Sequence, residues 1–543
     1  MFEKILTSLG SRTCLVVIFG ANVFYKALAV FAPSIHGHGF DSDEAIIGLM
    51  GLRSLEQGEL ALFFYGQDFG GGLEYLLTVA AFSVLPPSVS VLRIVTLALR
   101  LAADCVFYRI TCLSFEDRLR RNMALLLFVT MSSYFHGYLA RSSGVHLNNL
   151  LLGLALVHLF TSSARIFDRP LAKGVAIGLG LWVSDAILIF LIPAVAAGLA
   201  RHLEQPRRPL QRELPGLAQL LAAATLACGP RLYYLALRPA TWTLSYEGGG
   251  FSLAQWPRIQ EHLSALLSTT LPAYFYDGLV AAGLPWLAAP GVFLICASCL
   301  VASLAIAPAL VRGPRASSLA AAEGGPRILA AAEGGQRILA ALVLMAVFWS
   351  SLAALILNGE VYDAGLRYLI PMQPFAAMSL ALLLGAPGAY RVGPAAVKTA
   401  SLVAATLLLA VLGLISTGLL SAQEAEARSR AHAEIIRILE ENEVHHGWAD
   451  YWASYDISFR TREEVKLGSF YVDRIPAYSD AARSATRRAF VFRTAPADSP
   501  QDRLILEINE RAFERLSRRL EQSDTKTSTT EVGPYRVVIE TPK

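Results

Sequence analysis

Residues 14 to 33 read CLVVIFGANVFYKALAVFAP, and residues 36 to 45 read HGHGFDSDEA. The first stretch is an apolar run of about 20 residues, long enough to cross the hydrocarbon core of a bilayer as a helix. No small-residue cleavage site clearly follows it, so we expect an uncleaved first membrane helix. The second stretch then places Asp41, Asp43 and Glu44 directly beyond the membrane. Ionised groups at that depth are expensive unless they are solvated, paired or bound to a cation.

The composition of the whole chain also indicates a membrane protein. Of its 543 residues, 54% are hydrophobic and 17% are charged, whereas about a quarter are charged in soluble proteins. The net charge of +4 is small, and the basic residues lie in short segments between apolar runs. We therefore expect the lipid bilayer as a partner and no nucleic acid.

Apolar runs long enough to span a bilayer recur along the chain. They lie at 13–33, 91–113, 122–140, 147–163, 215–236, 287–311, 339–357, 368–386 and 398–421. The run 91–113 is the least typical, because it carries Arg93, Arg100 and Asp104. Residues 173–200 are mostly apolar but too short for two full spans, so we expect two short or re-entrant helices that turn near residues 182–185. The predicted fold class is mainly α, a polytopic membrane protein with about 11 transmembrane helices.

The short basic loops predict the orientation. Residues 109–121, 201–212 and 312–337 each contain four arginines, and such loops favour the cytoplasm. All three lie inside if the N-terminus is cytoplasmic. The outside regions are then 34–90, 137–149, 237–286, 358–367 and the tail from residue 422 onward.

The first outside region, residues 34–90, is longer than a connection requires, and long ordered loops tend to be functional. After Asp43-Glu44-Ala45 it continues through a helical stretch with Gly58 at its end to Tyr65-Gly-Gln67-Asp68-Phe-Gly70-Gly71 and Leu73-Glu74-Tyr75. This order resembles the first periplasmic loop of bacterial GT-C glycosyltransferases related to the protein O-mannosyltransferases and the aminoarabinose transferases. Arg367-Tyr368-Leu-Ile-Pro371 resembles the Arg-Tyr-x-x-Pro that opens a late membrane helix in that family.

The resemblance implies an inverting glycosyltransferase of the bacterial inner membrane. Its donor is a polyprenyl-phosphate-linked sugar, and its acceptor is a lipid, a glycan or a protein on the periplasmic face. The implied catalytic base maps onto Asp43, with Glu44 and Asp41 assisting. A second reading of Asp41 to Glu44 is an N-cap for the following helix, and both readings can hold together.

A departing phosphate needs a positive charge to neutralise it. Arg141 and Arg367, the latter followed by Tyr368, are the candidates for binding the donor phosphate. The alternatives are contact with lipid headgroups for Arg141 and a salt bridge to Asp363 for Arg367.

A metal is the other means of neutralising the phosphate. A divalent ion (Mg, Mn or Zn) held by Asp43 and Glu44 is a further expectation, with His36 and His38 as additional ligands. The alternative for the two histidines, which alternate with glycines, is a plain flexible loop.

Polar residues near these positions are candidates for substrate binding. They are Tyr65, Gln67, Asp68 and Glu74 in the first outside loop, His146 in the second, and Asp185 at the predicted turn. For Asp185 a structural ion pair is an equal alternative.

From residue 422 the composition changes, and charged helical stretches alternate with short apolar strands. We expect residues 1–421 to form the GT-C membrane domain and residues 422–543 to form a small periplasmic α/β domain. Two other function classes stay open: a transporter or flippase for lipid-linked glycans, and a non-catalytic GT-C-like scaffold. Inverted repeats typical of many transporters are not visible in the sequence.

Overall fold

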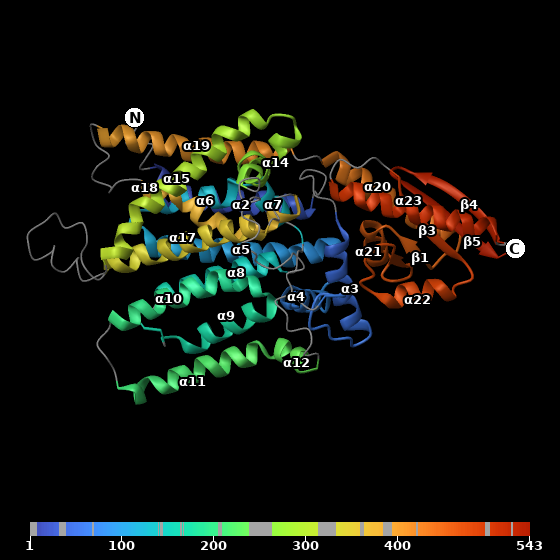
Figure 1. The fold of residues 1–543 in the computed structure, drawn as a ribbon, viewed down its shortest axis with the longest axis horizontal. Coiled ribbons are helices and arrows are strands. Elements are labelled where there is room, and N and C mark those ends of the chain that lie inside the picture. Colours follow the sequence, from blue (N-terminus) through green and yellow to red (C-terminus); the bar gives the residue numbers. More distant parts are fainter. Residues whose placement is uncertain are drawn as a thin grey trace, which may run out of the picture. The chain divides into compact units, whose positions relative to one another are not determined.

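The computed structural model is mainly helical, with one five-stranded sheet near the C-terminus (Figure 1). It describes residues 8–31, 40–67, 70–139, 141, 145–162, 165–166, 168–204, 209–237, 263–312, 333–358, 363–383, 394–419, 422–494, 500–522 and 525–542. The chain divides into two compact units. The bundle unit comprises residues 1–27, 98–139 and 145–420, and the loop–tail unit comprises residues 28–97, 140–144 and 421–543. This division differs from the sequence-based one in grouping the first outside loop with the tail.

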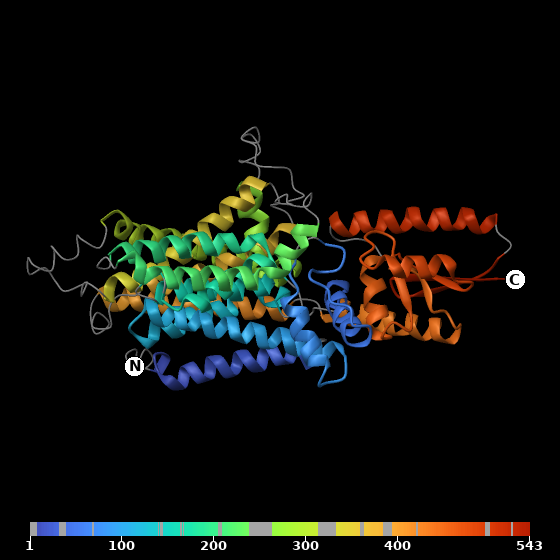
Figure 2. The same ribbon diagram turned by 90° about the horizontal axis from the view of Figure 1, so that it is seen from below.

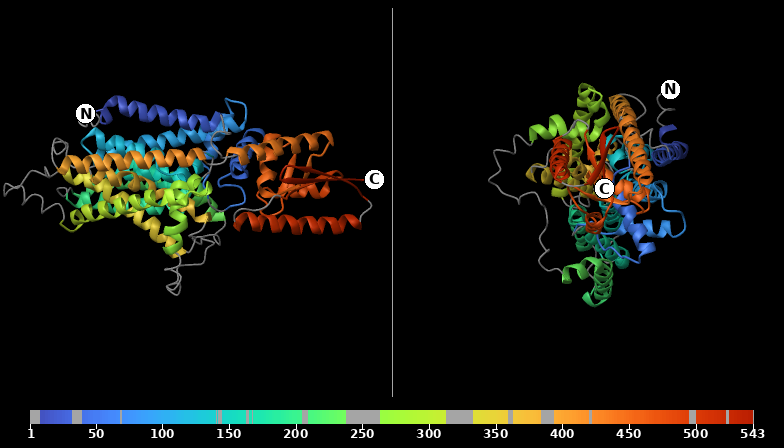
Figure 3. Two further views of the ribbon diagram at one scale, coloured as in Figure 1. Left: turned by 90° about the horizontal axis from the view of Figure 1, so that it is seen from above. Right: turned by 90° about the vertical axis from the view of Figure 1, so that its right-hand side faces the viewer.

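Most helices of the bundle unit run nearly parallel to one another (Figure 3). Each predicted span corresponds to one helix or to two consecutive helices. The helices are α2 (Arg12–Phe31), α5 (Val89–Ser114), α6 (Arg118–Thr130), α7 (Ser133–Tyr138), α8 (His146–Ser162), α9 (Pro170–Val183), η2 (Asp185–Ile187), α10 (Leu188–Glu204), α11 (Leu210–Ala227), α12 (Gly229–Leu237), η5 (Leu266–Thr270), α14 (Leu271–Ala281), α15 (Pro285–Arg312), α17 (Glu333–Asn358), η6 (Asp363–Met372), α18 (Gln373–Leu383) and α19 (Pro394–Leu419). Helices α2 and α5 continue into the loop–tail unit.

Several of these helices are suited to a bilayer. Among the described residues, Asp185–Leu203, Pro285–Ile306 and Leu366–Leu383 are long and apolar enough to cross a membrane. Helices α11 and α12 add a fourth span if the pair, bent by 60°, counts as one. The chain is therefore a multi-pass membrane protein, while the expected number of about 11 spans is not confirmed.

The turn predicted between residues 182 and 185 is present. Helix α9 ends at Val183, and Ser184 has extended backbone angles that break the helix. The hydroxyl of Ser184 accepts a hydrogen bond from the Ala186 N–H and caps the short helix η2. The segment after the turn is longer than expected, because η2 and α10 together form one of the candidate spans.

The charges in the predicted span 91–113 find partners inside the protein. In the bundle unit, Asp104 is fully buried and pairs with the Lys26 ammonium of α2. Asn22 donates a second hydrogen bond to the same carboxylate, at 2.8 Å. The guanidinium of Arg100 lies 3.4 Å from Asp104 and 3.9 Å from the ring centre of Phe135. Ion pairing and a cation–π contact thus reduce the cost of burying these charges in apolar surroundings.

The loop–tail unit contains two helices from the first loop and an α/β fold from the tail. Its elements are α3 (Ser42–Glu56), α4 (Leu73–Phe82), α20 (Ala422–Glu441), β1 (His446–Ala449), α21 (Tyr451–Arg460), β2 (Lys466–Ser469), α22 (Pro476–Ser484), β3 (Arg488–Arg493), α23 (Pro500–Glu521), β4 (Thr525–Val532) and β5 (Tyr535–Pro542). The strand order is β2-β1-β3-β5-β4. Strand β1 is parallel to β2 and β3, and β5 is antiparallel to β3 and β4. The predicted α/β character of the tail is confirmed.

Both faces of this sheet are covered by helices. On one face, Ile435 and Leu439 of α20 and Ile457 of α21 pack with Val491 and Ile539 of the strands. On the other face, α23 runs along the strands (Figure 2). Its Leu516 packs against aromatic side chains of β3. Alternate residues of a strand point to opposite faces, so these two clusters share one sheet.

The first loop and the tail share an aromatic core within the loop–tail unit. The ring of Phe459 in α21 lies 5.7 Å from Phe40 and 6.2 Å from Phe82, centre to centre. A Cβ atom at Gly48 of α3 would lie 2.5 Å from the Phe459 ring, so glycine permits the close approach of the two helices. This packing brings the start of α3 next to the start of α21.

Candidate active site

Asp41, Asp43 and Glu44 lie at the N-terminus of α3. Asp41 is the N-cap residue, and its carboxylate accepts a hydrogen bond from the Glu44 N–H at 3.0 Å. Asp43 and Glu44 lie in the first turn, where the helix dipole favours negative charge. The prediction that this segment caps the helix is confirmed. The cap also fixes the directions of the three carboxylates.

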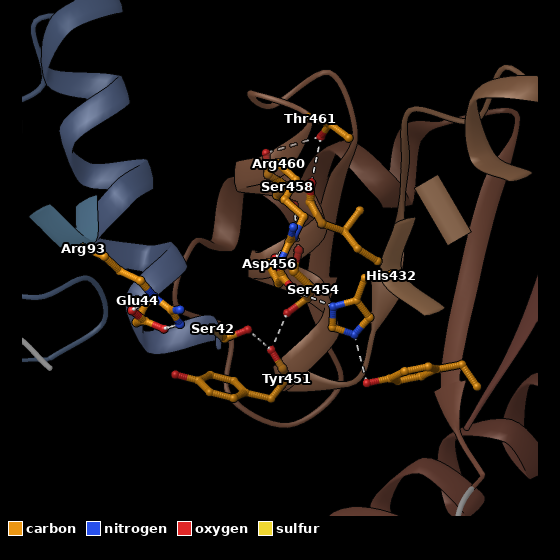
Figure 4. Close-up of polar contacts among 12 residues, drawn as sticks. Ser42, Glu44, Arg93, His432, Tyr451, Ser454, Asp456, Ser458, Arg460 and Thr461 are labelled. Carbon is orange, nitrogen blue, oxygen red and sulfur yellow. Dashed lines mark hydrogen bonds and ion pairs between the residues drawn. The ribbon is translucent and has the colours of Figure 1, made fainter. Parts of the chain in front are cut away.

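Two of the three carboxylates are held by arginines. Asp41 pairs with Arg141, with 2.6 Å between Oδ2 and a guanidinium nitrogen. Glu44 is fully buried and pairs with both Nε and the terminal nitrogen of Arg93, at 3.1 and 2.8 Å (Figure 4). Burial raises the pKa of Glu44, and the charge of Arg93 opposes that rise. These contacts give Glu44 and Asp41 a structural role, and their assistance in catalysis stays a prediction.

Asp43 differs from its two neighbours. It is half-buried and forms no ion pair with any described residue. The hydroxyl of Tyr451 donates a hydrogen bond to its Oδ1 atom at 2.6 Å. Burial and the charge of Asp41 raise the pKa of Asp43, while Tyr451, Arg474 and Arg141 act in the opposite direction. Of the three carboxylates, Asp43 is therefore the one best placed to accept a proton.

The donor atoms of this cluster do not fit a metal site. Glu44 binds an arginine through both oxygens, and Asp41 is shared between Arg141 and the helix cap. No group of three His, Cys, Asp or Glu side chains that would suit a metal occurs in the described part of the chain. His36 and His38 lie outside that part. We therefore derive no step through a metal ion.

The remaining candidates in the first loop are dispersed. The guanidinium of Arg53 lies 5.9 Å from the ring centre of Tyr65. Gln67 is half-buried, and Asp68 lies outside the described residues. Glu74 is 1% exposed and accepts a hydrogen bond from the Thr96 hydroxyl at 3.0 Å. That hydrogen bond gives the buried Glu74 carboxylate a structural role. Substrate binding by Tyr65, Gln67, Asp68 and Glu74 stays a prediction.

The donor-phosphate candidates near residue 367 form a second cluster, within the bundle unit. The Arg367 guanidinium lies 5.3 Å from the ring centre of Tyr368. The Tyr368 ring lies 6.0 Å from His146, which lies 5.5 Å from Tyr138. The structure thus brings together Arg367, Tyr368 and His146, which are far apart in sequence. The side chain of Asp363, the alternative partner of Arg367, lies outside the described residues.

Asp185 is the last of the candidates from the sequence. Its carboxylate lies 2.7 Å from the guanidinium of Arg231, and its side chain is 38% exposed. The expected alternative of an ion pair is therefore present, while binding of substrate by Asp185 stays a prediction.

Three residues interact with the acidic cluster in ways that the sequence does not indicate. Arg93 is visible in the sequence only as a charge in an apolar run, which signals a buried partner. Tyr451 belongs to a group of aromatic residues, with Trp452 and Tyr455, for which the sequence suggests a packed core or acceptor binding but no contact with Asp43. Arg474 carries no signal, because nothing in the sequence relates it to a segment about 430 residues earlier.

Comparison with solved structures identifies the class of fold. The chain is similar to ArnT from Cupriavidus metallidurans in the apo state, with 13% sequence identity, 97% of this chain and 98% of that chain covered, and a TM-score of 0.51. It therefore has a GT-C fold, and the expectation from the first-loop motif is confirmed at the level of the fold.

Two further structures are less similar. The apo oligosaccharyltransferase from Archaeoglobus fulgidus matches with 10% identity over 88% of this chain and 69% of that chain, with a TM-score of 0.49. The oligosaccharyltransferase AglB of the same organism, in complex with an inhibitory peptide and a dolichol-phosphate, matches with 11% identity over the same shares and a TM-score of 0.46. No protein-family model and no curated protein sequence matches the chain.

Proposed function

We propose that the protein is an inverting glycosyltransferase that moves a sugar from a polyprenyl-phosphate donor to a hydroxyl or amide acceptor. Asp43 is the catalytic base. The observation that carries this proposal is a half-buried carboxylate, free of an ion pair among the described residues, in the acidic first loop of a GT-C fold. Asp43 has a raised pKa, which suits a base that takes a proton near neutral pH.

The step is a single displacement. The acceptor passes its proton to Asp43 and uses the released electron pair to bond to the anomeric carbon, on the face opposite the phosphate. The bond between that carbon and the phosphate oxygen breaks, and its electrons leave with the phosphate. Attack from the opposite face inverts the anomeric centre.

A positive charge stabilises the departing phosphate. Arg367 is one candidate, because it forms no ion pair with any described residue. Arg141 is the other candidate; it lies in the same unit as Asp43, and its charge is shared with Asp41. Tyr368 lies beside Arg367 and would orient it.

The proposed setting is the periplasmic face of a bacterial inner membrane, with the N-terminus in the cytoplasm. The acidic first loop and the tail are then on the outer side, where a lipid-linked donor and a lipid, glycan or protein acceptor would meet. The basic segments 109–121, 201–212 and 312–337 support this orientation.

The test is turnover of radiolabelled polyprenyl-phosphate sugars by the purified protein in lipid. Loss of a general base lowers the rate by about 100- to 10,000-fold, so Asp43→Asn should show a fall of that size. Asp480→Asn is the matched control, because it makes the same chemical change at an exposed surface pair with Arg483.

Each result of this assay leads to a definite conclusion. Full turnover by Asp43→Asn would show that Asp43 is not the base. Wild-type protein that consumes no donor but carries labelled lipid-linked glycan across vesicles would be a transporter. Protein that does neither would fit a scaffold.

A further inference from the structure

Tyr451 connects the tail to the proposed base. It is the first residue of α21 in the tail, it is 7% exposed, and its hydroxyl donates to Asp43 in the first loop. Burial and the charge of Asp43 raise the pKa of Tyr451, so the phenol keeps the proton that it donates.

The position of Tyr451 is fixed from several sides (Figure 4). Its carbonyl oxygen accepts hydrogen bonds from the hydroxyls of Ser42, at 2.5 Å, and Ser454, at 3.0 Å. Asp450 caps α21 just before it, and the Asp450 N–H donates to the Val491 carbonyl of β3 at 3.0 Å. The phenol is therefore held at its carboxylate by the tail's sheet and by the capped end of α3.

This contact determines which oxygen of Asp43 is available. Tyr451 occupies Oδ1 and limits rotation of the carboxylate, whereas Oδ2 has no hydrogen-bond partner among the described residues. An acceptor would therefore meet Oδ2 in one fixed orientation. Fixing a reacting group in this way is a large part of how active sites lower barriers.

Arg474 is a charged residue of the tail that also acts on Asp43. Its backbone N–H donates a hydrogen bond to the Tyr455 hydroxyl oxygen at 2.6 Å, and its guanidinium donates to the Gly66 carbonyl at 3.1 Å. It makes no ion pair within the described residues, and its charge favours the ionised form of Asp43. The other charged groups that act on Asp43 are Asp41 and Arg141.

We propose that the tail is a part of the active site, in which Tyr451 positions the Asp43 carboxylate. This inference rests on the proposed glycosyltransferase function. It makes the tail a contributor to the chemical step and not a separate module for recruiting partners. Tyr451 is a positioning residue, because it acts through Asp43.

The first variant is Tyr451→Phe, which removes only the hydroxyl. A hydrogen bond to a charged group corresponds to about a 10- to 100-fold effect, so kcat should fall by that factor while KM for the donor stays within about twofold. The acid limb of kcat/KM should move to higher pH, because the lost hydrogen bond favoured ionised Asp43. Arg474→Gln should move the limb in the same direction, and it serves as the second variant if Tyr451→Phe does not fold.

Tyr478→Phe is the matched control. Its hydroxyl donates to the Glu463 carboxylate at 2.6 Å, and its side chain is as buried as that of Tyr451, but it does not contact Asp43. It should leave both kcat and the pH profile unchanged. Equal behaviour of Tyr451→Phe and Tyr478→Phe, with no shift in Arg474→Gln, would overturn the inference.

A second measurement separates this inference from the proposed function. A water-soluble carbodiimide modifies protonated carboxyl groups, and mass spectrometry of the intact membrane protein reports modification of Asp43. Tyr451→Phe should raise this modification and Tyr478→Phe should not, whether or not the protein consumes a sugar donor. An inactive wild type would refute the glycosyltransferase proposal, whereas unchanged modification in Tyr451→Phe would refute control of Asp43 by Tyr451.

Discussion

Replacing Glu44 by Gln should destabilise the protein rather than only slow its chemistry. Glu44 is fully buried, and its partner Arg93 is 3% exposed, with two short contacts between them. The substitution leaves the arginine charge buried without a counter-charge on this partner. Breaking such a pair from one side costs about 3–5 kcal/mol.

The size of the effect can be stated as a change in melting temperature. For a folding unit of about 200 residues, each kcal/mol lowers the midpoint by about 2–4 °C. We therefore expect a fall of about 6–20 °C for Glu44→Gln, measured by thermal unfolding of the purified protein in lipid. The double variant Glu44→Leu/Arg93→Leu, which removes both charges, should recover most of the loss, because well-packed apolar residues can replace a buried pair.

A different outcome would refute this reasoning. If Glu44→Gln has the same melting temperature as the wild type and still loses turnover of the donor, the pair with Arg93 does not stabilise the fold and Glu44 acts in the chemistry. If the double variant melts as low as the single one, the loss comes from packing and not from an unpaired charge.

Two further predictions concern the tail and the bundle. Burial acts to raise the pKa of Asp456, but His432 and Arg460 outweigh burial and hold the pKa below its normal value. The ionised carboxylate therefore stabilises the fold above about pH 4, and this stabilisation is lost as the pH falls through the lowered pKa. Asp456→Asn should lower stability at pH 7 and flatten its decline in acid, as measured by unfolding at a series of pH values, and an unchanged acid decline would contradict the assignment. In the bundle, a Cβ at Gly413 would lie 1.9 Å from the Thr130 carbonyl oxygen, so Gly413→Ala should destabilise by about 1–3 kcal/mol. The control Gly20→Ala should not destabilise the protein, because no atom lies within 4 Å of the added Cβ. Equal melting temperatures of the two variants would contradict close packing of α19 on α6.

The parts of the fold that depend on local patterns could be predicted from the sequence. Apolar runs mark the bundle helices, because a span has a minimum length, and the change in composition at residue 422 marks the tail. The cap at Asp41 could also be predicted, since Asp and Ser before an apolar periodic stretch are typical of a helix start. These features each depend on a few neighbouring residues.

The contacts that define the site could not be predicted in this way. Tyr451 donates to Asp43 across 408 positions of sequence, and no periodicity relates the two segments. Arg93 is visible as an unfavourable charge, but the sequence does not say that its partner is Glu44, 49 positions earlier. Pairings of this kind arise from tertiary packing, such as the approach of α3 to α21 that Gly48 permits.

The shared aromatic core of the first loop and the tail has a consequence for synthesis of the chain. The ribosome adds Phe459 more than 370 residues after Phe40 and Phe82. At about 5–20 residues per second, the loop waits for roughly 20–75 s before its partner exists. During that interval the apolar side chains of the first loop have no native cover from the tail, because Phe459 does not yet exist.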